Sequence, residues 1–120
     1  MKIVYEYSHL GGSEILQVRY PEIGQEINQV IARVSARRSN VLIEVQFGKY
    51  AFMFYDMAKF QYFFNENKAD VGIEIVPCHD LHTQMSSDVS YGEQLVYDIE
   101  RLKQYFPVVP VNVILIDVDD

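Results

Sequence analysis

Val41-Leu42-Ile43-Glu44-Val45-Gln46-Phe47 is an apolar run interrupted by one carboxylate and one amide. Its β-branched and aromatic residues predict a buried strand. Because side chains alternate along a strand, Glu44 and Gln46 point to one face, and the apolar residues at 41, 43, 45 and 47 point to the other, into a core. A buried carboxylate without a partner is costly or takes up a proton. We therefore expect these two polar residues to be solvated at a sheet edge or to hold a ligand, for which a divalent metal ion is one candidate.

Helix and strand patterns alternate after this strand. Residues 49–65 and 91–105 show helical spacing of apolar residues, and residues 71–76 and 110–118 are apolar runs of strand length. Residues 78–90 are mostly polar and predict a loop. The order strand, helix, strand, helix, strand from residue 41 predicts an α/β fold with parallel pairing in part of the sheet.

The N-terminal part predicts one strand and two helices. Residues 2–7 favour a short strand, and Ser13 can cap a helix over residues 14–19. Pro21 suits the first turn of a second helix. Five apolar residues recur there at helical spacing: Ile23, Ile27, Val30, Ile31 and Val34. A polar, basic break at residues 36–40 then leads into the strand of Glu44.

The predicted helix at residues 49–65 is apolar nearly all the way round. Its large apolar residues are Tyr50, Phe52, Met53, Phe54, Met57, Phe60, Tyr62, Phe63 and Phe64. One face can cover the sheet, but the remainder is too apolar to face water. In so small a domain we expect a partner subunit to cover it, most simply in a symmetric homodimer.

Size and charge bound the protein class. The chain has 120 residues, which indicates a single domain over residues 1–120 with one modest core. Its net charge is −7 and its pI is near 4.8. This balance argues against binding of nucleic acid mainly through a basic surface, but it leaves room for a DNA enzyme whose basic residues cluster locally.

Cysteine content and hydropathy point to a cytoplasmic location. The single cysteine, Cys78, excludes an internal disulfide and suits a reducing compartment. The N-terminus lacks the apolar core of a signal peptide. The apolar run at residues 106–116 is interrupted by two prolines and is too short to span a bilayer. We expect a soluble, cytoplasmic protein with no membrane partner.

Four segments carry a resemblance to a known family. They are Ile43-Glu44-Val45-Gln46-Phe47-Gly48-Lys49-Tyr50, Asp70-Val71-Gly72-Ile73-Glu74-Ile75-Val76-Pro77, Met85-Ser86-Ser87 and Ser90-Tyr91-Gly92-Glu93. In order and spacing they resemble the BglII/BstYI family of type II restriction endonucleases, and the N-terminal segment resembles that family too. The resemblance covers residues 1–34 and 41–118. It implies a restriction-endonuclease-like mixed sheet flanked by helices, here with a reduced core.

Two departures from the family pattern bear on activity. Family members are distinctly longer and carry a large segment before the strand of the Glu-x-Gln motif, where this chain has only residues 35–40. The family also places an Asp on the preceding strand, as the other half of its metal site. The matching register lands on Ser35, and no acidic residue lies between Gln29 and Glu44.

The resemblance implies Mg²⁺-dependent cleavage of DNA phosphodiesters. Mg²⁺ takes oxygen ligands, usually one or two carboxylates with phosphate and water. Glu44 and the backbone carbonyl of Val45 would be the protein ligands, and Gln46 would orient the attacking water as the second catalytic residue. Without the upstream Asp we expect weak Mg²⁺ binding, unless Glu22, Glu26 or Asp56 swings in or a partner supplies an acid.

The resemblance also implies how duplex DNA is read. Gly48 and Lys49 follow the catalytic strand, at positions the family uses near base edges or phosphates. Lys49 and Lys59 can neutralise phosphates, although each alone is more often a solvated surface lysine. Ser86, Ser87 and Asp88 match the second base-contacting loop, for which a plain turn is the ordinary interpretation. The implied target is a palindrome centred on GATC, read by a homodimer.

Three interpretations of function stay open. The first is a minimal Mg²⁺-dependent restriction endonuclease, favoured by Glu44 and Gln46. The second is a non-catalytic, DNA-binding or dimerising remnant of such an enzyme, favoured by the absent Asp. The third is a shortened scaffold that only self-associates, which fits the acidic balance.

Overall fold

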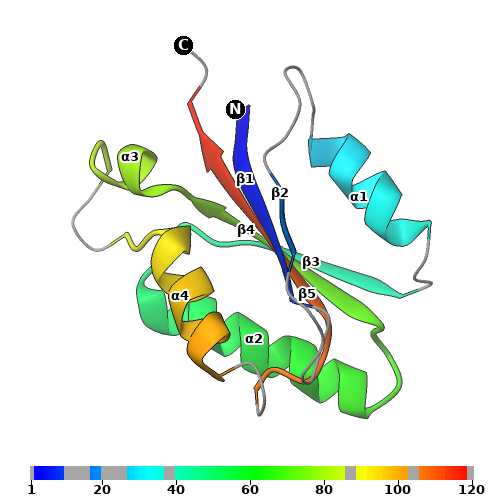
Figure 1. The fold of residues 1–120 in the computed structure, drawn as a ribbon. Helices are drawn as coiled ribbons and strands as arrows, with labels where there is room; N and C mark the ends of the chain where they lie inside the picture. Colours follow the sequence, from blue (N-terminus) through cyan, green and yellow to red (C-terminus); the bar gives the residue numbers. More distant parts are fainter. Residues whose placement is uncertain are drawn as a thin grey trace.

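The computed structural model of the chain describes residues 2–9, 17–19, 27–36, 40–85, 89–102 and 106–118, with the backbone alone for residues 17–19. Five strands form one sheet in the order β2-β1-β5-β4-β3 (Figure 1). Their bounds are β1 Lys2–His9, β2 Gln17–Arg19, β3 Val41–Val45, β4 Val71–Pro77 and β5 Val111–Asp117.

The sheet is mixed, with a parallel half and an antiparallel half. β3 pairs parallel with β4, and β4 pairs parallel with β5. β1 is antiparallel to both β5 and β2. The starts of β3 and β4 are tied by reciprocal bonds, since the Asn40 amide donates to Asp70 Oδ2 (3.1 Å) and the Asp70 amide donates to the Asn40 carbonyl (2.8 Å). The parallel pairing predicted from the element order is confirmed.

Helices cover both faces of the sheet. α1 (Ile27–Ser35) lies on one face, and α2 (Tyr50–Asn65) and α4 (Gly92–Leu102) lie on the other (Figure 1). A short helix, α3 (His79–His82), follows β4 directly. α2 and α4 connect the parallel strands, as parallel pairs require a crossover connection.

The core is split by the sheet into two layers. Under α2 and α4 lie Tyr7, Met53, Met57, Phe60, Val76, Leu95, Ile99, Val111, Val113 and Leu115. Under α1 lie Ile3, Val30, Ile73, Ile75, Ile114 and Ile116. β4 and β5 are apolar almost throughout because both their faces are covered. At Gly72, a Cβ atom would lie 2.3 Å from the Phe60 ring, so this glycine lets α2 approach the sheet closely.

Two predicted elements differ in the structure. The helix predicted at residues 14–19 is wrong at its end, because residues 17–19 form β2 and pair with β1; residues 14–16 lie outside the described part. The loop predicted at residues 78–90 contains α3, which buries Leu81. Both segments are too short for periodicity to identify them, and pairing or packing with distant residues decides their conformation.

The core prediction for the strand of Glu44 is only partly correct. Ile43 and Val45 are 42% and 57% exposed, whereas Val41 packs against the layer under α1. β3 is the last strand in the sheet order, and α1 leaves this part of the face uncovered.

Within the described residues, no helix has the length and apolar character needed to cross a membrane.

Candidate functional site

The side chains of Glu44, in β3, and of Gln46, directly after β3, point toward α2. Glu44 Oε1 accepts a hydrogen bond from Lys59 Nζ on α2 at 2.5 Å, and Gln46 Nε2 donates to Asp56 Oδ2 on the same helix at 2.9 Å. The predicted shared face of the two residues therefore agrees with the contacts. β3 is an edge strand in the described sheet, so its outer side has no strand partner there.

The backbone of Val45 faces that outer side. The Gln46 amide donates to the Ile75 carbonyl of β4 at 2.9 Å. In a trans peptide the C=O and N–H groups point in opposite directions, so the Val45 carbonyl points away from β4. A carboxylate on the face and a carbonyl at the open edge give two oxygen donors on adjacent residues, of the type that Mg²⁺ prefers.

The amide group of Gln46 is fixed at both ends. Asp56 accepts from its nitrogen, and its Oε1 accepts from the Gly48 amide at 3.1 Å. A Cβ atom at Gly48 would lie 2.7 Å from Gln46 Oε1, so only glycine permits this approach. The hydrogen-bond network thereby assigns which end of the amide is oxygen and which is nitrogen.

Lys59 lies between two carboxylates. Its Nζ is 2.5 Å from Glu44 Oε1 and 3.7 Å from Asp56 Oδ1. The hydrogen bond with Glu44 raises the pKa of the Lys59 ammonium, and the charge of Asp56 adds to that shift. Lys59 is thus a firmly charged ammonium whose partners are both acids of the site.

Glu74 lies beside Glu44 on the neighbouring strand. The two residues are register partners in the parallel β3–β4 pair, and the Glu74 side chain is fully buried. No donor reaches either of its oxygens within the described residues. The pKa of Glu74 is raised to about 11, chiefly by burial; the adjacent Asp56 and Glu44 carboxylates contribute to this rise, and the Lys59 charge opposes it. Glu74 is therefore a neutral acid at pH 7, able to share its proton with Asp56.

The donor set fits a metal that is completed by substrate and water. Among the described residues, no three His, Cys, Asp or Glu side chains converge as a ready-made metal site. Two carboxylates and a carbonyl suffice for Mg²⁺ when phosphate and water provide the remaining oxygens. The ammonium group of Lys59 already contacts Glu44 and Asp56, so the charges of these two residues favour a cation between them.

The other predicted site residues are spread around this centre. Lys49 is exposed immediately before α2, and Gly48 lies beside Gln46. Ser35 is the exposed last residue of α1 and stands on no strand. Ser86, Ser87 and Asp88, together with Glu22 and Glu26, lie outside the described residues.

Sequence reasoning missed Glu74 and treated Asp56 only as a remote substitute. Both carried a signal. Asp56 falls on the buried stripe of α2 with Met53, Met57 and Phe60. Glu74 interrupts the apolar run of β4 in the way that Glu44 interrupts β3. A carboxylate on an otherwise buried face indicates a partner, a proton or a ligand.

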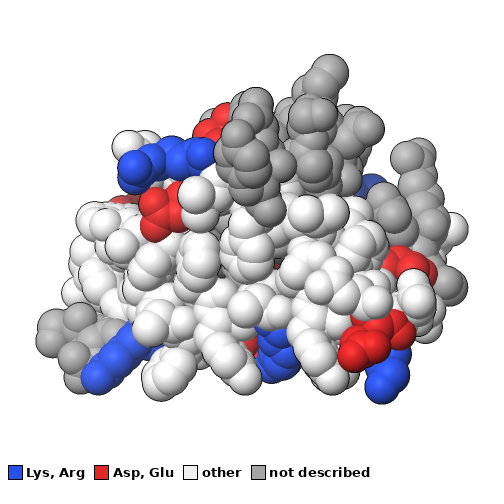
Figure 2. All heavy atoms as spheres, turned by 90° about the horizontal axis from the view of Figure 1, so that it is seen from below, with Lys and Arg blue, Asp and Glu red and all other residues white. Residues whose placement is uncertain are grey.

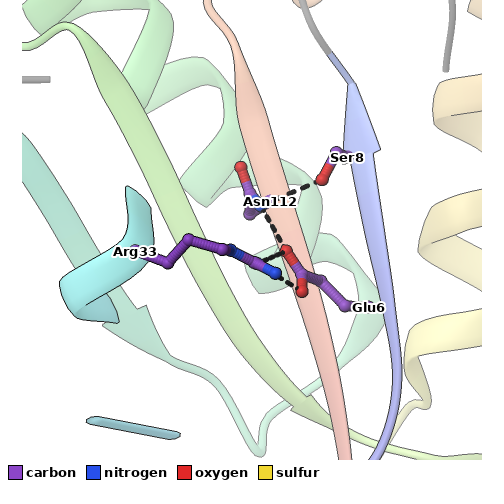
Figure 3. A network of polar contacts seen from close by, with 4 residues as sticks. All are labelled: Glu6, Ser8, Arg33 and Asn112. Carbon is purple, nitrogen blue, oxygen red and sulfur yellow. Dashed lines mark hydrogen bonds and ion pairs between the residues drawn. The ribbon is translucent and has the colours of Figure 1, made fainter. Parts of the chain in front are cut away.

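A second polar cluster lies on the opposite face of the sheet (Figure 3). We call Glu6, Ser8, Arg33 and Asn112 the Glu6 network. Arg33 Nη2 of α1 donates to both carboxylate oxygens of Glu6, and Asn112 Nδ2 donates to Glu6 Oε2 at 2.7 Å and to Ser8 Oγ at 3.0 Å. This network attaches α1 to β1 and β5, and both carboxylate oxygens of Glu6 accept hydrogen bonds within it.

Comparison with known proteins agrees with the fold. A family profile described as "Restriction endonuclease BglII/BglIII" matches residues 34–116. The solved structure titled "Crystal structure of free BglII" has a TM-score of 0.54 and 21% identity to this chain. The match covers 85% of this chain and 61% of that chain, and at this identity it establishes the shared fold. No curated protein matches this sequence. The predicted restriction-endonuclease-like α/β fold is confirmed.

Proposed function

Because this chain belongs to the BglII/BglIII family of restriction endonucleases, we propose that it cleaves duplex DNA with Mg²⁺ at a palindrome centred on GATC. The observation that carries the proposal is the arrangement of Glu44 and Gln46. They lie on one face of an open-edged strand, and the amide of Gln46 is fixed at both ends. A side chain oriented this firmly suits positioning of a reacting group.

Each residue has a defined task in the proposed reaction. Glu44 and the Val45 carbonyl would hold the Mg²⁺ ion, which would polarise the scissile phosphate and lower the pKa of the attacking water. Gln46 accepts from or donates to that water and so fixes its direction of approach. Gln46 carries no charge, so it adds orientation without electrostatic stabilisation.

Gly48, Lys49, Lys59, Ser86, Ser87 and Asp88 are the proposed DNA contacts. Lys49 is exposed beside the catalytic strand, which suits a phosphate contact. Lys59 is a third exposed and adjoins Glu44, so it can turn outward when DNA or a metal arrives. In the proposed base contacts, Ser86 and Ser87 donate to or accept from either type of base, and Asp88 accepts from cytosine N4.

The proposed enzyme acts as a homodimer through α2. Phe52, Tyr55 and Tyr62 are 55%, 65% and 56% exposed, and their spacing puts them on one stripe of the helix. Tyr55, Ala58, Lys59, Tyr62 and Phe63 line a hollow of about 400 Å³ on the same helix. Figure 2 shows this side of the molecule, where few charged residues interrupt the surface. A two-fold partner would bury the exposed aromatic rings of this stripe.

Sedimentation velocity tests the dimer. We expect the parent chain to sediment as a dimer, and Tyr55→Glu to shift it to monomer because a carboxylate would then be buried in an apolar interface. Tyr97→Glu is the matched control, since Tyr97 is equally exposed, at 62%, but lies on α4. A monomeric parent chain at all accessible concentrations would refute α2 as a dimer interface.

One observation favours the second candidate, a DNA-binding or dimerising remnant without cleavage. Lys59 neutralises the one carboxylate that the family motif retains, and no described strand precedes β3 with an Asp. In a protein that had lost its metal, such an ion pair would stabilise the fold, because the ammonium of Lys59 neutralises the remaining carboxylate of Glu44.

Cleavage and binding assays separate the two candidates. The chain is incubated with a GATC-containing duplex and Mg²⁺ or Mn²⁺, beside Glu44→Ala and the control Glu66→Ala at an exposed position after α2. Cleavage by the parent chain and by Glu66→Ala, but not by Glu44→Ala, supports the enzyme. Salt-dependent binding in a gel shift without cleavage supports the remnant. Failure of both assays refutes the nuclease and the DNA-binding remnant, and leaves only a shortened scaffold that self-associates. A cytoplasmic location remains a prediction.

A further inference from the structure

The three carboxylates on the α2 face of β3 and β4 form what we call the acidic cluster: Glu44, Asp56 and Glu74. Glu44 and Glu74 are register partners on adjacent strands, and Asp56 faces them from α2. Asp56 is nearly completely buried, at 3% exposed, and Glu44 is about a third exposed. Carboxylates repel one another in such surroundings unless a cation or protons compensate them.

Lys59 supplies the compensating charge and marks where a cation is stable. Its Nζ contacts Glu44 Oε1 at 2.5 Å and Asp56 Oδ1 at 3.7 Å. Because one nitrogen contacts both oxygens, Glu44 Oε1 and Asp56 Oδ1 lie close to each other. One charged group bridges a carboxylate of the family motif and a carboxylate of α2.

The buried Glu74 carboxyl is an independent sign that the cluster is incomplete. Both of its oxygens are buried without a hydrogen-bond donor among the described residues, although the great majority of buried polar atoms in proteins have one. Glu74 is the register partner of Glu44 in the parallel β3–β4 pair, so its carboxyl group lies on the same face of the sheet. The cluster therefore holds more acceptor capacity than Lys59 and Gln46 use.

We propose that Asp56 is the second carboxylate of the metal site, and that a divalent cation replaces the Lys59 ammonium between Glu44 and Asp56. Asp56 on α2 would thus take the place of the Asp that the family carries on an upstream strand. The inference rests on the proposed function, because it concerns the metal of that same site. It makes Asp56 both a metal ligand and the acceptor that fixes the Gln46 amide.

The position of Asp56 favours it over Glu74 as this ligand. Oδ1 of Asp56 faces Lys59 while Oδ2 accepts from Gln46, so one oxygen is already directed at the cation. Glu74 on β4 is fully buried, with no exposed surface at which a cation could bind. Lys59 is a third exposed and extends from a helix surface, so its departure requires only rotation of its side chain.

Mn²⁺ binding without DNA tests the inference. Mn²⁺ is titrated into the full chain and free Mn²⁺ is followed by its EPR signal. We expect the parent chain to bind Mn²⁺, and Asp56→Asn, which keeps the shape of the side chain, to weaken binding by about tenfold or more. Lys59→Met removes the competing ammonium and should tighten binding by about tenfold. Glu66→Gln is the control and should bind as the parent chain does.

Each outcome decides the inference. Equal Mn²⁺ binding by the parent chain and by folded Asp56→Asn overturns the inference. It is also overturned if neither the parent chain nor Lys59→Met binds Mn²⁺. If circular dichroism shows that Asp56→Asn does not fold, Lys59→Met decides alone, and absence of tightening overturns the inference.

Cleavage is scored separately from binding. Undiminished cleavage by Asp56→Asn would overturn this inference and leave the nuclease proposal intact. Asp56-dependent Mn²⁺ binding by a parent chain that does not cleave DNA would refute the nuclease proposal and support this inference.

Discussion

Glu6 and Glu74 both bury a carboxyl group on the same sheet, on opposite faces, and the hydrogen-bond partners of the two groups differ. Glu6 accepts hydrogen bonds from Arg33 Nη2 at both of its oxygens and from the Asn112 amide at one of them. Glu74 receives no donor within the described residues and faces two further carboxylates. Burial of a charge is tolerated only when it is paired and hydrogen-bonded. The Glu6 network therefore stabilises the fold, whereas the acidic cluster costs stability and is explained by what it can bind.

The largest expected effect comes from breaking the Glu6 network. Arg33→Ala leaves the Glu6 carboxylate buried with one donor, and we expect the free energy of unfolding to fall by about 2–4 kcal/mol. The lower part of that range applies because Arg33 is itself 36% exposed. Urea denaturation at pH 7 measures the loss.

Arg101→Ala is the matched control for Arg33→Ala. Arg101 is 65% exposed and lies 3.8 Å from Asp98, so its removal should cost less than about 0.5 kcal/mol. Equal losses for the two arginines would show that the Glu6 network contributes no more than a surface pair.

The next effect has the opposite sign and concerns the acidic cluster. The folded protein raises the pKa of Glu74 from 4.5 to about 11, so above about pH 5 the unfolded chain binds fewer protons than the folded chain. Stability contributed by this group is thus full below pH 4.5 and is lost progressively as the pH rises toward 11. Glu74→Gln removes this loss, which amounts to at most about 2 kcal/mol between pH 6 and 7.5.

Urea denaturation at pH 6 and 7.5 compares Glu74→Gln with the parent chain and with Glu66→Gln. The slope of stability against pH should flatten in Glu74→Gln alone. Parallel slopes for all three proteins would mean that Glu74 does not hold its proton in the folded state.

The smallest expected effect tests whether the residues of the Glu6 network depend on one another. Asn112→Ala removes one donor to Glu6 and one to Ser8 but leaves the Arg33 ion pair, so it should cost about 1–2 kcal/mol. A double-mutant cycle with Arg33→Ala should be non-additive, because both residues serve one carboxylate. Additive losses would contradict a shared network. Asn65→Ala, at an exposed helix end, is the control.

Long apolar segments could be predicted from the sequence, and short ones could not. α2, β4 and β5 follow from periodicity because each buries many residues of its own. β2 has three residues and exists through its pairing with β1. The exposure of Ile43 and Val45 depends on the edge position of β3, which no local pattern reports.

The candidate site, too, could be predicted from the sequence only in part. The common face of Glu44 and Gln46 follows from alternation along one strand. Their partners Asp56 and Lys59 come from α2, and Glu74 comes from β4. The residues of α2 that lie over β3 depend on how closely α2 packs against the sheet, including its close approach at Gly72.

The sequence by itself determined the α/β order, the Glu-x-Gln face of β3 and the absence of an acid between Gln29 and Glu44. These are local properties, fixed by backbone geometry and residue identity. Only the tertiary structure decided that Lys59 bridges Glu44 and Asp56, and that Glu74 lies buried beside them. The reason is that burial and close approach of charges depend on the packing of a helix against a sheet, which brings together residues distant in sequence.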